Sequence, residues 1–294
     1  MKIAVLMGGP SIERDVSLKT GHAVAQACHE LGHETVELSF RTNYKKFLPE
    51  LRSMDIVFNG LHGTVGEDGI IQAWLDENDI QYTGSGAFSS AMCMNKDKSK
   101  NIARNLGLLT PDWEIIHRID DVISFPTPVV IKPNHQGSTV GISIVHNISE
   151  KSTAINEAMK YGDNIMVEKY VSGREITVAI LGEEALPIVE INSNNELFDY
   201  ECKYTPGMSN YICPALLDDN LTNDIQKNTK IIFNALDCWA YGRADYLLDE
   251  DGRYFFLEMN TLPGMTSTSL VPIAAKAHGL SFVKLINSIL EMSL

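Results

Sequence analysis

The segment from residue 242 to residue 260 constrains the fold most tightly, because it carries the signature of a β-hairpin. Asp251-Gly252 lies between two strand-like runs, and this dipeptide favours a two-residue type I′ turn in which both central residues have positive φ. With that turn, Asp245 lies directly opposite Glu258. Asn260 follows two residues later, so its side chain leaves the same face of the hairpin.

Two carboxylates that face each other destabilise a sheet unless something compensates their charge, and the pair itself contains no residue of opposite charge. Oxygen ligands favour a hard divalent cation, and Mg²⁺ that carries substrate phosphates is the usual ion of this kind. We therefore predict a metal site at Asp245, Glu258 and Asn260. The alternative is a solvated acidic hairpin without a ligand.

Length and charge limit the classes of protein. The chain has 294 residues, which suffices for two or three domains, and its net charge of −14 argues against a general nucleic-acid binder. The first apolar run is too short for a signal peptide, and no run reaches the length of a membrane span. Five scattered cysteines without a Cys-x-x-Cys pair favour reduced thiols. We therefore expect a cytoplasmic protein that binds neither nucleic acid nor a membrane.

The first 86 residues alternate between strand and helix patterns, which is typical of a parallel sheet covered by helices. Strands are expected at 2–7, 35–38, 55–59 and 81–83, and helices at 69–78 and from a cap at Ser11 or Ser17 to about Leu31. Gly84-Ser85-Gly86 predicts the end of an N-terminal α/β substrate domain at residue 86.

The rest of the chain favours antiparallel sheets, so the fold class is α/β with α+β domains. Strands are expected at 129–133, 142–145, 165–171 and from 175 to 189, and helices at 87–106, 221–240 and 271–292. We predict a central domain at 87–185 and a C-terminal domain at 186–294. A polar stretch at about 199–213 is predicted to be a lid that excludes water.

Several motifs suit an anionic ligand. Lys132 ends a strand just before the Gly137-Ser138-Thr139-Val140-Gly141 loop, and a lysine together with backbone N–H groups suits a polyphosphate. An ordinary flexible hairpin is an equally good interpretation of this loop. The start of the helix at Ser269-Leu270 would bind a carboxylate or serve as a plain N-cap. Glu13 and His62 follow predicted strands, where structural roles are the default.

Nine blocks in the same order and spacing make the chain similar to one family, and they span nearly its whole length. They are Gly-Gly-Pro-Ser-Ile-Glu-Arg-Asp-Val-Ser at 8–17, Leu-His-Gly at 61–63, Gly-Glu-Asp-Gly at 66–69, Tyr-Thr-Gly-Ser-Gly at 82–86, Lys-Pro at 132–133, Gly-Ser-Thr-Val-Gly at 137–141, Tyr-Glu-Cys-Lys-Tyr at 200–204, Gly-Arg-Ala-Asp at 242–245 and Glu-Met-Asn-Thr-Leu-Pro-Gly-Met-Thr-Ser at 258–267. With these blocks, the chain resembles the D-alanine–D-alanine ligases, which have the ATP-grasp fold.

The resemblance implies ATP between the two antiparallel domains and two Mg²⁺ ions, or Mn²⁺ in their place, at Asp245, Glu258 and Asn260. The positions that match the family's nucleotide site are Lys96, Lys132, Ser138, Glu168, Lys169, Val171, Glu175 and Lys203. It also implies that the carboxylate of one D-alanine attacks the γ-phosphoryl group and yields an acyl phosphate. Lys203 and the metals would offset charge on the transferring group.

The resemblance further implies that the amine of a second D-alanine attacks the acyl carbon. Arg243 and the backbone N–H of Gly264 would then stabilise the tetrahedral intermediate. Glu13 would bind the ammonium of the first D-alanine beside His62, and Ser269 and Leu270 the carboxylate of the second. Ser138 and Tyr204 would link Glu13 to the lid by hydrogen bonds.

Tyr204 is the position at which the family discriminates between second substrates, and tyrosine favours an amine over D-lactate. The sequence departs from the family's usual residues at Gln136, Thr139 and Leu197-Phe198, which puts the affinity for ATP in question. The family also implies a homodimer. The product would be D-alanyl-D-alanine for peptidoglycan synthesis.

Three other functions are compatible with parts of this pattern. One is a D-alanine ligase that uses D-serine, and another is an ATP-grasp enzyme of the carboxylase type, which would not need Glu13, Tyr204 or Ser269. The third is a regulator that binds nucleotide without turnover. Such a regulator is expected to have lost Arg243, Asp245, Glu258 or Asn260, and all four are present.

Overall fold

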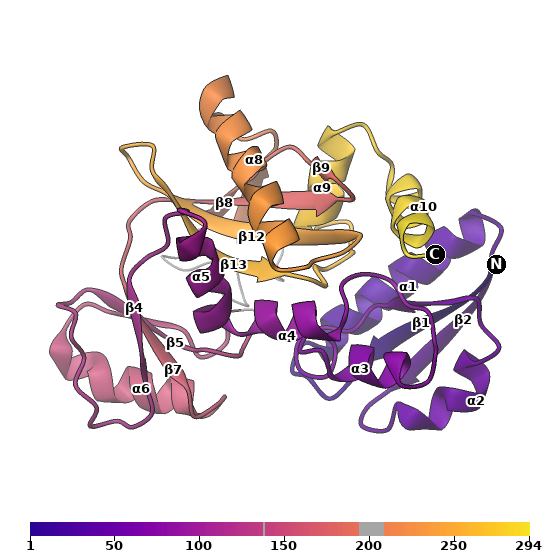
Figure 1. Cartoon of the computed structure of the whole chain (residues 1–294), viewed down its shortest axis with the longest axis horizontal. Coiled ribbons are helices and arrows are strands. Elements are labelled where there is room, and N and C mark those ends of the chain that lie inside the picture. The colour runs from indigo at the N-terminus through magenta and orange to yellow at the C-terminus, as the bar shows by residue number, and fades with distance from the viewer. Residues whose placement is uncertain (138, 194–208) are drawn as a thin grey trace.

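The computed structural model describes residues 1–137, 139–193 and 209–294. Ser138, Lys203 and Tyr204, to which the sequence assigned roles, lie outside these ranges, as do Leu197-Phe198 and most of the predicted lid. The described residues form three sheets, which succeed one another along the chain and are joined by helices (Figure 1). None of the helices in the described ranges is long and apolar enough to cross a membrane.

The N-terminal sheet is parallel, as predicted, with strand order β2-β1-β3. Its elements are β1 (Lys2–Gly8), α1 (Arg14–Glu30), β2 (Glu34–Phe40), the 3-10 helix η1 (Lys45–Phe47), α2 (Leu48–Leu51), β3 (Ile56–Asn59) and α3 (Ile70–Asp76). The expected strand at 81–83 is a single parallel bridge between Val57 and Tyr82. Loops at the carboxyl ends of these strands are where open α/β sheets bind ligands.

The predicted serine cap of α1 is wrong, because neither hydroxyl caps the helix. Glu13 is the N-cap residue of α1, and its side chain does not cap either. The Ser17 hydroxyl instead accepts from the Gly8 N–H at 2.8 Å and donates to the Gly60 carbonyl at 2.7 Å. Ser17 therefore joins the carboxyl ends of β1 and β3, which places Glu13 and His62 at the same edge of the sheet.

The four-stranded sheet has the order β4-β7-β5-β6, and all its pairs are antiparallel. Its elements are β4 (Trp113–Ile116), β5 (Val129–Pro133), β6 (Ser143–Val145), the 3-10 helix η2 (Ile148–Glu150), α6 (Lys151–Met159) and β7 (Ile165–Lys169). The sequence patterns did not predict β4 or α6. Val129 and Ile131 pack with α6 in one core, so Val130 and Lys132 leave the opposite face of the sheet.

The six-stranded sheet follows the order β11-β10-β8-β12-β13, with β9 paired to β8. Its strands are β8 (Arg174–Leu181), β9 (Glu184–Ala185), β10 (Val189–Ser193), β11 (Ser209–Ile212), β12 (Tyr241–Leu248) and β13 (Tyr254–Asn260). The predicted domain boundary after residue 185 falls within this sheet, because β8 and β9 precede it. The end of the predicted lid is also part of the sheet, since β11 pairs with β10.

Helices cover this sheet and connect it to the N-terminal unit (Figure 1). They are α4 (Ala87–Met94), α5 (Lys96–Asn105), α8 (Asp219–Ala235), α9 (Leu270–Ala277) and α10 (Phe282–Met292). The predicted helix at 87–106 is interrupted at Asn95, whose side chain accepts from the Lys98 N–H at 3.1 Å and starts α5. The predicted helix at 271–292 is interrupted at Gly279, where φ is +89°.

The β12–β13 turn differs from the predicted two-residue turn. Asp249 pairs through its N–H with the Arg253 carbonyl at 2.9 Å, so the loop contains residues 250–252. Gly252 has φ of +79°, whereas Asp251 is not among the residues with positive φ. A loop of three residues with glycine in the left-handed conformation is the next most common hairpin connection.

Candidate active site

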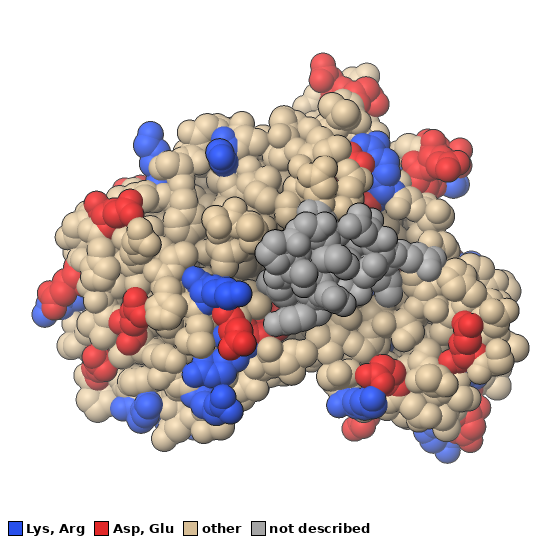
Figure 2. Space-filling model, turned by 180° about the vertical axis from the view of Figure 1, so that it is seen from behind, with Lys and Arg blue, Asp and Glu red and all other residues tan. Residues whose placement is uncertain are grey.

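The face of the six-stranded sheet that carries the predicted metal ligands is set by alternation along β12. Ala244 and Tyr246 are buried in the core beneath α8, so Arg243 and Asp245 leave the other face. This face and the face of the four-stranded sheet that carries Val130 and Lys132 enclose a cleft. On the face of the molecule shown in Figure 2, acidic and basic side chains are interspersed.

One pocket of the cleft lies between the two antiparallel sheets and has a volume of about 350 Å³. Val130 and Ile144 line it from one sheet, and Leu247 and Leu257 from the other, so a flat apolar group fits between them. Six of the residues expected to bind nucleotide line this pocket: Lys96, Lys132, Glu168, Lys169, Val171 and Glu175. Apolar walls with a few charged groups at one end are typical of small-molecule sites.

Two buried lysines lie at the polar end of this pocket. The Lys96 Nζ donates to Glu258 Oε2 at 2.8 Å and to the Gln136 carbonyl at 2.6 Å. The Lys132 Nζ donates to Glu168 Oε2 at 2.7 Å. Burial, together with the nearby charge of Lys96, lowers the pKa of Lys132 to about 7. An anion at this end of the pocket would therefore favour the protonated form of Lys132.

The ammonium group of Lys169 lies on the surface, so it is not placed to bind a phosphate in the pocket. Its side chain is exposed, and its Nζ lies 2.9 Å from Asp112 Oδ2 on the surface. Only the backbone and the stem of Lys169 are available to the pocket. The predicted role of the 168–171 segment in presenting backbone groups to a base is compatible with this arrangement.

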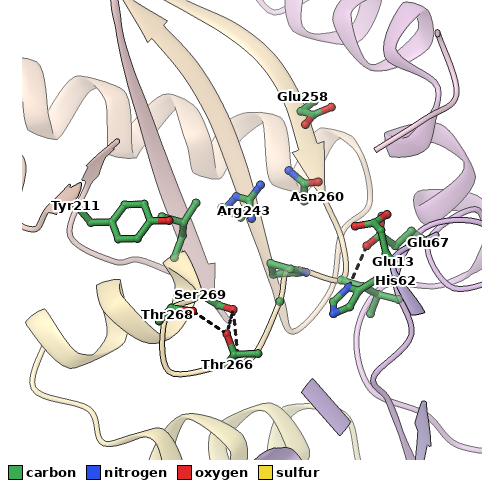
Figure 3. Close-up of a pocket in the computed structure, with 14 residues that line it drawn as sticks. Glu13, His62, Glu67, Tyr211, Arg243, Glu258, Asn260, Thr266, Thr268 and Ser269 are labelled. Carbon is green, nitrogen blue, oxygen red and sulfur yellow. Dashed lines mark hydrogen bonds and ion pairs between the residues drawn. The ribbon is translucent and has the colours of Figure 1, made fainter. Parts of the chain in front are cut away.

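A second pocket adjoins the first and is smaller, about 70 Å³ (Figure 3). Glu13, His62 and Glu67 reach it from the N-terminal unit, and Arg243, Glu258 and Asn260 reach it from β12 and β13. The loop before α9 contributes Gly264, Thr266, Thr268 and Ser269, and Tyr211 points inward from β11. Glu258 lines both pockets, so they meet at the hairpin.

His62 is held at the N-terminal side of this pocket by two side chains. Its Nδ1 lies 3.3 Å from Glu67 Oε1, and its Nε2 lies 3.0 Å from the Thr20 hydroxyl, which accepts the Met265 N–H at 3.3 Å. Burial opposes the charged imidazolium, but the hydrogen bond and charge of Glu67 and the charge of Glu13 outweigh it and raise the pKa of His62. A protonated His62 suits an anionic neighbour.

Glu67 and Thr20 received no role from the sequence, although Glu67 belongs to the Gly66-Glu67-Asp68-Gly69 block. The signal that was available for Glu67 is its distance of five residues from His62 after β3. Thr20 offered no signal of this kind, because its contacts to His62 and to Met265 join residues that are far apart in the chain.

Glu13 is buried at the start of α1, and two glycines approach its carboxylate. A Cβ atom built at Gly63 would lie 2.8 Å from Glu13 Oε2, and one at Gly137 would lie 3.8 Å from it. Gly137 directly precedes Ser138, so the start of the 137–141 loop lies close to Glu13. This convergence agrees with the predicted neighbourhood of Glu13 and the 137–141 loop.

The predicted metal ligands are neighbours, as the hairpin argument required. Asp245 pairs with Glu258, and the Asn260 Nδ2 donates to Asp245 Oδ2 at 3.0 Å. The expectation that no cation accompanies the two carboxylates is wrong. Arg243 donates to both oxygens of Asp245 at 2.8 and 2.7 Å, and Lys96 binds Glu258, because side chains from β12 and α5 reach the hairpin.

The donor set fits a hard cation. Carboxylate and amide oxygens from Asp245, Glu258 and Asn260 lie where the two pockets meet, and Thr177 holds Asp245 Oδ1 with a hydroxyl donor at 2.6 Å. No cluster of three His, Cys, Asp or Glu side chains that could hold a metal occurs in the described part of the chain.

The loop before α9 leaves the start of that helix open to a ligand. The Ser269 hydroxyl does not cap α9, because it accepts from the Thr266 N–H at 3.0 Å and lies 2.8 Å from the Thr266 hydroxyl. The first N–H groups of α9 thus remain available for an anion. A Cβ atom at Gly264 would lie 2.9 Å from Ser269 Oγ, so the loop packs closely against the Ser269 side chain at this point.

Comparisons with known proteins identify the same architecture. The family model described as D-ala D-ala ligase C-terminus matches residues 102–291, and the one described as D-ala D-ala ligase N-terminus matches residues 37–85. The chain is 45% identical to D-alanine–D-alanine ligase from Aquifex aeolicus, over 99% of this chain and 100% of that protein.

Solved structures agree with this result. The crystal structure of D-alanine–D-alanine ligase from Bacillus anthracis complexed with ATP has a TM-score of 0.85 and 32% identity, and covers 100% of this chain and 96% of that one. The VanG D-Ala:D-Ser ligase from Enterococcus faecalis has a TM-score of 0.86 and 27% identity, with 100% and 99% covered.

The parallel sheet and the two antiparallel sheets around a shared cleft thus define an ATP-grasp fold, and with it the class of the ligases. Within that class, the chain belongs to the D-alanine–D-alanine ligase family.

Proposed function

We propose that this chain ligates two D-alanines to D-alanyl-D-alanine, with conversion of ATP to ADP and phosphate through a D-alanyl phosphate, for the synthesis of peptidoglycan precursors. The observation that carries the proposal is the junction of two pockets at Glu258, beside Arg243 and Asp245. One pocket suits a nucleotide and the other a small zwitterion. A phosphoryl group passed between them would lie at this junction.

The nucleotide occupies the pocket between the antiparallel sheets. The adenine stacks between the apolar walls that Val130 and Leu247 provide, and the phosphates extend toward Lys96 and Lys132. Asp245, Glu258 and Asn260 would hold two Mg²⁺ ions, or Mn²⁺, and such ions when bound neutralise charge on the phosphates. The ATP complex of the Bacillus anthracis ligase supports this assignment of the pocket.

The first D-alanine binds in the pocket of Figure 3 with its ammonium at Glu13 and near Glu67. A carboxylate oxygen of this substrate attacks the γ-phosphorus, the bond to the bridging oxygen breaks, and ADP leaves. The product is an acyl phosphate. The positive charge of Arg243 and Lys96 beside the junction stabilises the anionic groups that approach each other there.

The second D-alanine binds with its carboxylate at the start of α9, next to Ser269 and Leu270. Its neutral amine attacks the acyl carbon, and Arg243 and the Gly264 N–H stabilise the resulting oxyanion. The C–O bond to phosphate then breaks, the amine loses a proton, and the dipeptide forms. The roles of Ser138, Lys203 and Tyr204 remain predictions from the sequence, because these residues are not described.

The proposal includes a homodimer and a cytoplasmic location, where ATP is available. D-Serine is the alternative second substrate that the experiment below tests, since the VanG relative is a D-Ala:D-Ser ligase. Three hydroxyl groups from Thr266, Thr268 and Ser269 line the pocket on that side.

Phosphate release in the presence of ATP and Mg²⁺ tests the proposed reaction. D-Alanine is the substrate, L-alanine is the control, and D-serine and D-lactate are offered as second substrates, with products identified by mass. D-Alanine-dependent release with D-alanyl-D-alanine as the main product supports the proposal. A mixed D-alanyl-D-serine product would reassign the second site, and ATP binding without D-alanine-dependent release would favour a regulator.

A further inference from the structure

Lys100 on α5 is a buried charged residue that the proposed chemistry does not use. Its exposed fraction is 0%, and lysine is almost never fully buried unless it is paired. It follows Lys96 by four residues, so both side chains leave the same face of α5. Lys96 lines the nucleotide pocket, whereas Lys100 is not among its lining residues.

Lys100 is paired with Glu168, which is also buried. The Lys100 Nζ donates to Glu168 Oε1, and the Lys132 Nζ donates to Glu168 Oε2 at 2.7 Å. Each oxygen of one carboxylate thus receives one lysine. The Glu168 side chain is committed to these two ammonium groups and holds Lys132 at the polar end of the pocket.

The surroundings of Lys100 fix it in place. Its Nζ lies 4.9 Å from the centroid of the Trp113 ring, and the Trp113 Nε1 donates to Asp97 Oδ1 at 2.8 Å. Trp113 pairs with Glu168 across β4 and β7, so the ring and the carboxylate come from adjacent strands. Lys100 therefore lies between α5 and the four-stranded sheet. Its ion pair with Glu168 is one of the contacts that join the two.

Two lysines share one carboxylate, so full protonation of both would leave an excess of positive charge. Burial lowers the pKa of Lys100 well below its usual value, and the charges of Lys132 and Arg104 lower it further. An anion that enters beside Lys132 relieves this excess. The arrangement is suited to a polyphosphate and poorly suited to an uncharged ligand.

We propose that Lys100 is a positioning residue for nucleotide binding: it fixes the carboxylate of Glu168, which in turn aims Lys132 at the phosphates. This inference rests on the proposed function, in which Lys132 contacts the phosphates of ATP. It assigns the Glu168 side chain to the lysine pair.

The test compares Lys100→Met with Lys98→Met. Methionine keeps most of the length of the lysine stem, and its introduction at position 100 leaves Glu168 and Lys132 as a pair of opposite charges, so the fold is expected to tolerate it. Lys98 lies on the same helix but is exposed, so it controls for the loss of a positive charge. Binding of ATP and of adenosine is measured by calorimetry, and KM for ATP and for D-alanine by phosphate release.

Lys100→Met is expected to weaken ATP binding roughly tenfold or more, as the loss of one charge-assisted hydrogen bond does. KM for ATP rises accordingly, whereas adenosine binding and KM for D-alanine stay within about twofold, since neither ligand reaches Lys132. Lys98→Met behaves as wild type. In a Glu168→Gln background, Lys100→Met has little further effect, because the carboxylate it acts through is gone.

Lys100→Gln serves as the second variant if Lys100→Met does not fold, because the amide retains a donor for Glu168. It is expected to keep ATP affinity between those of wild type and Glu168→Gln. Unchanged ATP affinity in Lys100→Met or Lys100→Gln, or an equal loss for ATP and adenosine, overturns the inference. Wild-type protein that binds no ATP instead overturns the proposed function on which the inference rests.

Discussion

Asp245 lies directly opposite Glu258, although the turn between β12 and β13 imposes a register that differs by one residue. Near the turn, Leu248 pairs with Tyr254 and Tyr246 pairs with Phe256, whereas Asp245 pairs with Glu258. The register shifts between Asp245 and Tyr246, which leaves Leu257 as the extra residue of a bulge. The bulge compensates the three-residue loop, and it brings the two carboxylates together at the junction of the two pockets.

The β12–β13 turn is predicted to require glycine at position 252, because this residue has a positive φ. Gly252 has φ of +79°, and no atom of the residues that the structure describes would lie within 4 Å of a Cβ atom there. Gly252→Ala should therefore destabilise the protein by about 1 kcal/mol through strain alone, measured by denaturant unfolding. Gly252→Asn should cost less, because asparagine tolerates this region. Equal stability of the alanine variant and wild type would contradict the assigned turn.

Arg243→Lys is predicted to lower kcat by roughly 10²–10³, the effect of losing one oxyanion donor. The guanidinium binds Asp245 through two parallel hydrogen bonds, and lysine cannot reproduce this fork. Arg253→Lys is the matched control, because that side chain lies at the turn of the same hairpin and is 58% exposed. A kcat for Arg243→Lys within threefold of the control would show that Arg243 does not stabilise the transition state.

Asn260→Ala is predicted to weaken the apparent affinity for Mg²⁺ by roughly 10–100-fold, the usual cost of disturbing a metal site. Catalysis then requires a correspondingly higher Mg²⁺ concentration. The variant removes an oxygen donor and also the contact to Asp245 at 3.0 Å. Activity is measured against Mg²⁺ concentration at saturating ATP. Asn234→Ala on α8 is the control, since this asparagine is exposed. An unchanged Mg²⁺ profile would refute the metal assignment.

Glu67→Gln is predicted to lower the pKa of His62. In wild type, burial opposes the imidazolium but Glu67 and Glu13 raise the pKa. Because the folded-state pKa exceeds that of the unfolded chain, about 6.5, His62 contributes stability that is complete below pH about 6.5. This contribution is lost as pH rises through the folded-state pKa.

In Glu67→Gln the unopposed burial should weaken or reverse this pH dependence. NMR titration of the His62 ring, with urea unfolding across the same pH range, checks both statements. If the ring titrates at the same pH in both proteins, the Glu67 contact does not govern His62.

The sequence predicted which residues lie together at the hairpin better than it predicted the turn that joins the two strands. Period-two alternation along β13 places Glu258 and Asn260 on one face whatever loop joins the strands, whereas the position of Asp245 opposite Glu258 depends on the register. The family motifs match residues that line the two pockets. Loop length depends on backbone angles, and Asp-Gly is compatible with more than one hairpin loop. The interruption at Asn95 was missed for a similar reason, since an asparagine that caps a helix differs from one within it only in its hydrogen bonds.

The partners of the buried charges could not be predicted from the sequence. Arg243 and Lys96 neutralise the hairpin carboxylates, and Lys96 comes from a helix more than 140 residues earlier in the chain. The partners of Lys100 and Thr20 were equally unpredictable, because their contacts join elements that are far apart in the chain. Local patterns report the faces of strands and helices, but not which faces meet.

The most direct test of the account uses D-alanine labelled with ¹⁸O in its carboxylate, with ATP and Mg²⁺. If a carboxylate oxygen attacks the γ-phosphorus and the amine then displaces phosphate, one ¹⁸O atom appears in each phosphate released, alongside D-alanyl-D-alanine. Released phosphate without ¹⁸O would contradict the acyl-phosphate route and the assignment of the two adjoining pockets.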